Sequence, residues 1–381
     1  MNNISFWEKE SFLGPYDFVI LGGGIVGLST ALHLKKQQPE ASVLVLERGT
    51  LPSGASTKNA GFACFGSPTE LLDDLTKMSA EQVYGLVQKR YRGLQLLQET
   101  LGPEAIGLEP QGGYEVFRIG QENHFLNTVQ SLPEFNTALR EILPFSPVFR
   151  EVSVEDYGFG MQGLCGIIRI EGEAQIHTGK MMKALWQKVL KAGVMILSGV
   201  CVTGFQEEGQ QVSIQTLDHT SILSRKLCIT MNGFTQSLIP ELPVKPGRAQ
   251  VLITKPIEGL KLRGSFHYDA GYYYFRNVGN RILLGGGRNL DFAGEETMEM
   301  GNTPKIMDSL HLLLQEMILP GVLFEEDIRW SGIMGVGPEK NYILERISPN
   351  VCVGVRMGGM GVALGSLVGL ELSELALISG N

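Results

Sequence analysis

The chain has 381 residues, with 40 acidic against 32 basic side chains and a formal net charge of -8 at pH 7. Its length exceeds that of one small domain and predicts about two domains with a large core. The acidic balance, without any run of lysines and arginines, argues against nucleic acid or an anionic membrane as a partner.

The cysteines stand far apart and form no CxxC pair, at Cys64, Cys165, Cys201, Cys228 and Cys352. An odd, widely spaced set is typical of a reducing compartment, and it predicts a cytoplasmic protein without a structural metal site. The first 17 residues lack the basic end and the apolar stretch of a signal peptide. No apolar run is long enough to span a bilayer, so we expect no integral membrane segment.

The first regular elements are predicted to be a strand, a helix and a second strand. The apolar run 18–21 is typical of a parallel strand buried on both faces. It enters three spaced glycines: Gly22 permits a tight turn, Gly24 leaves room for a pyrophosphate, and Gly27 lets the helix pack closely. The second strand ends in Glu47, whose carboxylate can accept the ribose hydroxyl protons. This spacing predicts a dinucleotide-binding βαβ unit, and the alternative is a fortuitous glycine-rich turn.

The helix of this unit begins just after the second glycine, where Ile25 and Val26 are candidate cofactor-binding residues. Free backbone N–H groups and the positive end of the helix dipole favour phosphate at such a position. Pro39 ends the helix. The unit alone does not separate nicotinamide from flavin cofactors, so the segment that follows it has to decide.

After the second strand, Glu47 and Arg48 lead into the stretch GASTKNAGFACFGSP. It resembles a loop of the D-amino-acid oxidase, glycine oxidase and sarcosine oxidase family of FAD-dependent oxidoreductases. In that family the loop wraps the FAD diphosphate, and small residues let its backbone press on the cofactor. The matching residues are Gly54, Ala55, Ser56, Asn59, Ala60 and Gly61. Some members attach flavin through a histidine in this loop, and the lack of one here implies noncovalent FAD.

The resemblance continues along most of the chain. Residues 174–193 look like a helix of the family, 228–234 like a strand beside the adenosine half, and 271–287 like a hairpin of the substrate domain. Residues 351–365 match a strand, a glycine-rich turn and a helix. The resemblance implies that further cofactor-binding residues are Arg48, Val202, Asn232, Gly233, Arg356, Gly358, Gly359, Met360, Gly361 and Val362.

The C-terminal element has a physical logic of its own. A strand over 351–355 enters the glycine turn 358–361, and a helix follows. The helix N-terminus would offer unpaired backbone donors and a positive dipole to the negative charge that a reduced flavin carries near N1. The alternative is an ordinary C-terminal helix docked on a sheet.

These segments predict an α/β fold in which a Rossmann-like FAD-binding domain is interleaved with a substrate domain, itself α+β with an antiparallel sheet. Apolar side chains at helical spacing predict helices over 80–101 and 302–319. The FAD-binding domain is expected to comprise residues 16–78, 152–240 and 328–381, and the substrate domain residues 79–151 and 241–327.

The chemistry of the family removes a hydride from the carbon that carries an amine and passes it to flavin N5. The protein need only hold a neutral amine with its C–H over the ring, so no catalytic acid or base is required. The chain departs from its relatives where they bind a carboxylate or activate oxygen, because those positions hold Met334, Ala363 and Leu283. A substrate α-carboxylate is therefore absent or held by other residues.

Three cations are alternative substrate anchors. Arg276 shares a strand face with Tyr272 and Tyr274 by period-two alternation, which would place a guanidinium beside two phenols. The alternative is a solvated arginine at a strand end. Arg356 directly precedes the flavin-facing glycines, where it could pair with a substrate carboxylate or with a nearby acid. Lys58, in the glycine-rich loop, ranks below both.

The leading hypothesis is a FAD-dependent oxidase or dehydrogenase for a small amine or amino acid, with oxygen or a carrier as electron acceptor. The lack of the relatives' carboxylate-binding residues favours N-substituted amines, such as γ-glutamylated polyamines, as substrates. A 2-hydroxy-acid dehydrogenase is the second hypothesis, with His267 as its base, although a lone histidine is more often structural. A non-catalytic flavin-holding subunit is the third, and the acidic balance disfavours an RNA-modifying module.

Overall fold

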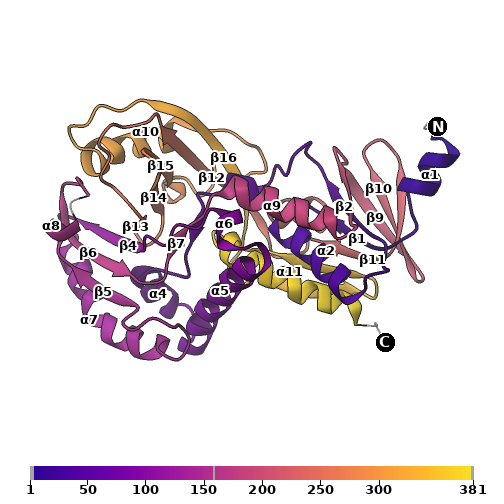
Figure 1. Cartoon of the computed structure of the whole chain (residues 1–381), viewed down its shortest axis with the longest axis horizontal. Helices are drawn as coiled ribbons and strands as arrows, with labels where there is room; N and C mark the ends of the chain where they lie inside the picture. Colours follow the sequence, from indigo (N-terminus) through magenta and orange to yellow (C-terminus); the bar gives the residue numbers. More distant parts are fainter. Residues whose placement is uncertain (1–3, 158, 379–381) are drawn as a thin grey trace.

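The computed structural model describes residues 4–157 and 159–378. It contains two large β-sheets. In Figure 1 the labelled strands of the first sheet lie on the right and those of the second on the left. The first sheet has the order β17-β18-β11-β1-β2-β8, and β10 and β9 extend it from β11. Its strands are β1 (Tyr16–Leu21), β2 (Val43–Glu47), β8 (Met195–Ser198), β9 (Val202–Glu208), β10 (Gln211–Thr216), β11 (Ser221–Ile229), β17 (Ile343–Ser348) and β18 (Val351–Val355).

Burial on both faces explains the apolar composition of the central strands. β1 pairs in parallel with β2 and with β11, so Leu21 lies between Leu46 and Ile229. One face packs against the helices α2 (Ile25–Gln37), α9 (Thr178–Lys191) and α11 (Gly361–Leu377). The other face packs against β10 and the segment after β11. The predicted βαβ unit therefore forms, and its strands carry continuous apolar runs for the expected reason.

The second sheet has the order β16-β12-β15-β14-β13-β4-β6-β5. All of its neighbouring strands are antiparallel except β13 and β4, which are parallel. It is thus the predicted antiparallel sheet with one parallel step. Its strands are β4 (Gly113–Arg118), β5 (Phe149–Val152), β6 (Leu164–Ile170), β12 (Lys245–Thr254), β13 (Ser265–Tyr268), β14 (Tyr273–Val278), β15 (Arg281–Gly286) and β16 (Glu326–Val336).

Helices cover both faces of the second sheet. One face packs against α10 (Pro304–Leu313) and the π-helical turn Leu314–Ile318 that continues it, and the other against α4 (Pro68–Leu75) and α7 (Glu122–Leu139). The helix α5 (Ala80–Leu101) has the predicted bounds and packs against α11. An added Cβ on its Gly93 would overlap the carbonyl oxygen of Ala363, so the two backbones touch directly.

Two of the predicted domain boundaries do not coincide with the division of the strands between the two sheets. Strand β6 pairs with β4 and with β5, although all of β6 falls in the predicted cofactor segment 152–240. Strand β16 pairs with β12, although the segment from 328 was assigned to the cofactor domain. These segments have ordinary strand sequences, and only the partner across the sheet decides to which domain a strand belongs.

Short elements complete the chain. They are α1 (Phe6–Phe12), α3 (Ala55–Lys58), α6 (Pro103–Ile106), α8 (Val154–Tyr157), the 3-10 helices η1 (Asn232–Ser237) and η2 (Arg288–Leu290), and the small sheet of β3 (Phe62–Ala63) with β7 (Ala174–Gln175). Across the described ranges, none of the helices combines the length and the apolar character needed to cross a membrane.

Candidate cofactor and substrate site

A cavity of about 710 Å³ is lined by residues from both sheets. Its volume falls in the range of small-molecule sites, about 300–1,000 Å³. One part of its wall comes from β1, β2, α2, α3 and the start of α11, and another from β12 to β16. The site is therefore built where the carboxyl ends of the parallel strands meet the second sheet.

The glycine turn after β1 has the expected geometry. Gly22 adopts a φ of +110°, a conformation that side chains rarely tolerate, and it lines the cavity together with Gly24. An added Cβ on Gly27 would overlap the carbonyl oxygen of Gly22, so this glycine allows the close packing of helix on strand. Ile25 and Val26, the first residues of α2, also line the cavity.

Glu47 is buried at the end of β2 and lines the same part of the cavity. Its Oε2 accepts the N–H of Gly23 at 2.9 Å, and its Oε1 accepts the N–H of Gly49 at 2.9 Å and the hydroxyl of Ser53 at 3.1 Å. These bonds fix the carboxylate beside the glycine turn. Arg48 lies next to it, with its guanidinium carbon 4.2 Å from the ring centroid of Phe234.

The glycine-rich loop forms the short helix α3 along the cavity. Asn59 holds it in shape, because its side-chain amide donates to the carbonyl of Ser56 at 2.9 Å and its Oδ1 accepts the N–H of Gly61 at 2.9 Å. Ser56 Oγ accepts the N–H of Ile25 at 3.0 Å, which ties the loop to the start of α2. All six predicted loop residues line the cavity: Gly54, Ala55, Ser56, Asn59, Ala60 and Gly61.

The start of α11 also faces the cavity, and its N-cap residue Met360 makes no side-chain cap. The predicted residues Gly358, Gly359, Met360, Gly361 and Val362 all line the wall, as do Val202 and Asn232. Gly233 does not belong to the lining: an added Cβ there would overlap the carbonyl oxygen of Met334, so this glycine serves close packing. The N-terminus of α11 therefore provides a second patch of backbone donors.

Arg276 does not face the cavity as a free guanidinium, and that prediction is wrong. Tyr273 and Phe275 pack in the core of the second sheet, as alternation along β14 requires, but the Arg276 side chain is bound to backbone carbonyls. Its Nη1 donates to the carbonyls of Gly61 at 2.7 Å and Ile176 at 2.9 Å. Burial lowers the pKa of Arg276 to about 10. Its role in the structure is to hold the glycine-rich loop.

Arg356 lines the cavity, but its guanidinium already has partners. Nε donates to the carbonyl of Asn341 at 2.8 Å and Nη1 to that of Pro243 at 3.2 Å, and Nη2 lies 3.5 Å from Glu339 Oε2. The backbone at Arg356 has a φ of +68°, and its N–H donates to Asn232 Oδ1 at 3.1 Å. These contacts favour the alternative of an arginine paired within the protein.

The two predicted tyrosines line the cavity, and Tyr273 between them packs in the core of the second sheet. Burial raises the pKa of Tyr274 to about 12, so its phenol stays protonated as a hydrogen-bond donor. Tyr272 is 42% exposed. The cavity wall also includes Met334 and Ala363, whereas Leu283 packs in a small apolar cluster with Ala60 and Val251.

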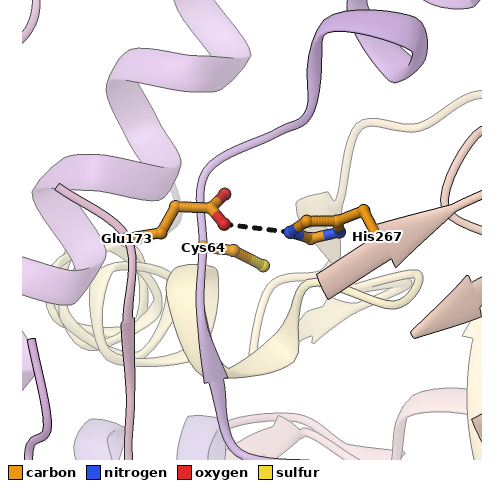
Figure 2. A group of neighbouring side chains, drawn as sticks. All are labelled: Cys64, Glu173 and His267. Carbon is orange, nitrogen blue, oxygen red and sulfur yellow. Dashed lines mark hydrogen bonds and ion pairs between the residues drawn. The ribbon is translucent and has the colours of Figure 1, made fainter. Parts of the chain in front are cut away.

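His267 lies beside Glu173 and Cys64 (Figure 2). The sequence analysis did not predict either neighbour. His267 Nε2 and Glu173 Oε2 lie 2.9 Å apart, both side chains are buried, and His267 and Cys64 line the cavity. Burial on its own lowers the pKa of His267, but the charge and hydrogen bond of Glu173 bring the net pKa above its usual value. Their separation along the chain left no local signal of this pairing.

The three side chains of Figure 2 carry atoms of metal-ligand type within 4.8 Å of one another. Burial, together with the charges of Glu173 and Glu70, raises the pKa of the Cys64 thiol well above its usual value. A metal ion would require a thiolate and would have to displace the bond between His267 and Glu173. The arrangement is therefore that of a histidine–carboxylate pair beside a neutral thiol.

A second charged group in the wall was also missed. Arg90, on α5, is buried, and its Nη2 lies 3.1 Å from Glu70 Oε1, while Lys340 Nζ lies 3.5 Å from the same oxygen. Burial favours the neutral acid, but Arg90 and Lys340 outweigh it and lower the pKa of Glu70 to about 2. The sequence contained one indication of this charged group, because Arg90 shares the apolar face of its helix with Val87 and Leu94.

The fold and the cavity define a Rossmann-like, dinucleotide-binding protein, with a glycine turn, an acid after the second strand and a helix N-terminus on one wall. The sequence pattern of the family described as FAD dependent oxidoreductase matches residues 17–375. The chain belongs to this family, whose members depend on FAD. The predicted family and the predicted fold class are thereby confirmed.

Individual relatives are distant. The chain is 24% identical to glycine oxidase of Pseudomonas putida over 331 residues, which cover 84% of this chain and 83% of that protein. The structure of glycine oxidase from Geobacillus kaustophilus superposes with a TM-score of 0.77 at 19% identity, covering 96% of each chain. The bifunctional protein ThiO/ThiG of Trichormus variabilis is 25% identical over 240 residues, 62% of this chain. That match covers 34% of ThiO/ThiG, about a third of its length.

Proposed function

We propose that the chain holds FAD without a covalent bond and oxidises the C–H next to the amine of an amino acid or a related small amine. The observation that carries the proposal is the single cavity that joins two kinds of wall. Backbone donors of the glycine turn and of two helix N-termini line one part, and Tyr272, Tyr274 and His267 line another. Related proteins of this family include glycine oxidase.

The residues on the dinucleotide side fit the cofactor. Gly22 and Gly24 leave the backbone bare where a diphosphate approaches, and Glu47 is fixed where it can accept ribose hydroxyls. The N-terminus of α11 would stabilise negative charge on a reduced ring. When bound, FAD supplies the hydride acceptor at N5. The glycine-rich loop contains no histidine, which supports noncovalent binding.

His267 is the residue suited to receive a proton from the substrate. Its bond to Glu173 orients the ring, and the carboxylate stabilises the imidazolium that a proton transfer creates. An amine substrate must lose its ammonium proton before the C–H bond can be broken, because only the neutral nitrogen donates electrons to the carbon. We infer that His267 takes this proton at Nδ1, while Glu173 holds the other ring nitrogen, Nε2.

The same pair favours a second candidate function, the oxidation of a 2-hydroxy acid. That reaction requires a base for the hydroxyl proton, and a buried histidine–carboxylate pair on the cavity wall provides one. The amine reaction remains the first proposal because it agrees with the glycine oxidase relatives. Both reactions would use the same position above the ring.

A screen of anaerobic flavin reduction tests the proposal. The purified protein should be yellow, and a D-amino acid, an N-methyl amino acid or a polyamine conjugate should bleach it. Bleaching by 2-hydroxy acids but by no amine would establish the second candidate instead. A yellow protein that none of these compounds bleaches would be a flavin-holding subunit without catalysis.

The electron acceptor is a separate part of the proposal. We infer that electrons pass to a carrier rather than directly to oxygen, because Leu283 holds the position where sarcosine oxidases carry their oxygen-activating lysine. Leu283 is buried among apolar neighbours, so no charge stands at that position. Reoxidation of the bleached protein by dissolved oxygen should be slow. Hydrogen peroxide produced at the rate of turnover would contradict this inference.

A further inference from the structure

Arg288 is a cavity residue that the mechanism above does not use. It follows β15 as the first residue of η2, directly after Gly286 and Gly287, and it lines the cavity. Gly286 and Gly287 have φ values of +125° and +76°, which favour glycine. The N–H of Gly287 donates to the carbonyl of Tyr272 at 3.0 Å. This turn fixes the start of η2 against the segment that carries Tyr272.

The guanidinium of Arg288 has no hydrogen bond or ion pair within 4–157 and 159–378. Its Nε is buried and without a partner. The guanidinium carbon lies 5.1 Å from the ring centroid of Phe292, and that ring makes an edge contact with Tyr272 at 6.0 Å between centroids. Burial lowers the pKa of Arg288, although acids nearby partly offset this. A half-buried guanidinium held against an aromatic ring is thus left with free donors.

The two acids whose charges act on Arg288 are Glu296 and Glu295, and both pair with other side chains. Glu295 accepts from Arg248 at both carboxylate oxygens, at 2.9 Å each, and from Gln250 at 2.8 Å. Glu296 pairs with Lys245 at 2.9 Å. Neither carboxylate therefore serves as the partner that a desolvated arginine requires.

The other arginines of the cavity are less suitable for a substrate. Arg90 is paired with Glu70, and the guanidinium of Arg356 donates to two backbone carbonyls. Arg48 follows Glu47 on the dinucleotide side. Arg288 instead lies beside Tyr272, on the side of the cavity that also carries Tyr274.

We propose that Arg288 binds a carboxylate of the substrate, with the Tyr272 phenol as a neighbouring donor. A planar guanidinium with free donors matches a carboxylate with two hydrogen bonds, and the aromatic ring behind it keeps its plane in place. The inference rests on the proposed oxidoreductase function and narrows it. The substrate is a carboxylate-bearing amine such as an amino acid, and Arg288 takes the role that Met334 leaves open in this chain.

Isothermal titration of the holoprotein tests this binding without turnover. The probes are acetate and glutarate, with acetamide as the uncharged analogue of acetate. Wild type should bind at least one carboxylate and not acetamide, and Arg288→Met should weaken that binding about tenfold or more, the loss expected for a charged hydrogen bond. Arg288→Lys should restore part of it. Arg225→Met, which removes an exposed arginine paired with Asp17, is the matched control and should bind as wild type does.

The outcomes separate this inference from the proposed function. Arg288→Met should keep the wild-type FAD content and, with a substrate from the reduction screen, should raise KM more than it lowers kcat. Equal carboxylate binding by wild type and Arg288→Met would overturn the inference, as would loss of binding in Arg90→Met alone. A wild-type protein that holds no FAD would refute the proposed function, and the same titration of the flavin-free protein would then decide whether Arg288 binds a carboxylate.

Discussion

Replacing Gly24 by valine should greatly reduce FAD binding. A Cβ at this position would lie 2.8 Å from Ser56 Oγ, whereas carbon atoms in contact lie about 3.5–4.0 Å from their neighbours. The hydroxyl of Ser56 would have to turn away, which breaks the bond from Ile25 N–H to Ser56 Oγ. The valine side chain would also stand in the part of the cavity that the diphosphate needs, and overpacking costs about 1–3 kcal/mol, so FAD affinity should fall about five- to 140-fold.

The assay compares bound flavin per chain after gel filtration, from the visible absorbance, with affinity measured by titration of the apoprotein. Circular dichroism establishes that the variant folds. Gly85→Ala is the control, because Gly85 lies in α5 with open space around it and alanine favours a helix. Acid precipitation of wild type should release the flavin into solution, as noncovalent binding requires. Full FAD occupancy in Gly24→Val would refute the assignment of this turn to the diphosphate.

Three further substitutions test other contacts. Glu173→Gln should lower the pKa of His267, so the acid limb of the pH profile of flavin reduction should move to lower pH; an unmoved limb would show that His267 is not the base. Gly93→Ala should destabilise the chain by about 1–3 kcal/mol in thermal unfolding, since it wedges α5 away from Ala363. Arg276→Met should lower flavin retention by loosening the glycine-rich loop, and unchanged retention would contradict that role.

The local elements were predictable because their causes are local. The apolar strand before Gly22, the helix after Gly24 and the acid at Glu47 each follow from short-range steric or hydrophobic rules, and all formed at the expected places. The long helix α5 was equally clear from its apolar spacing. The predicted lining residues on the dinucleotide side came from one continuous motif together with a family resemblance.

The substrate side of the cavity was harder to predict, because the residues that contact one another there are far apart in the sequence. Strand alternation placed Arg276 on the correct face, but a flexible side chain chose two backbone carbonyls that only the fold brings near. The pair of His267 with Glu173 and the group around Arg90 join residues from separate segments. Periodicity states which face a residue occupies and gives no information about what stands opposite it.

The sequence by itself determined that this chain carries a glycine turn and an acid for a dinucleotide, and that it belongs with FAD-dependent oxidoreductases, because those signals depend on backbone conformation over a few residues. The tertiary structure alone decided which charged side chains are satisfied and which remain open. Arg276 and Arg356 found partners within the protein, whereas the guanidinium of Arg288 kept its donors free among the described residues. Long-range contacts decide which arginines have partners, because a buried charge is stabilised only where the fold brings a hydrogen-bond acceptor beside it.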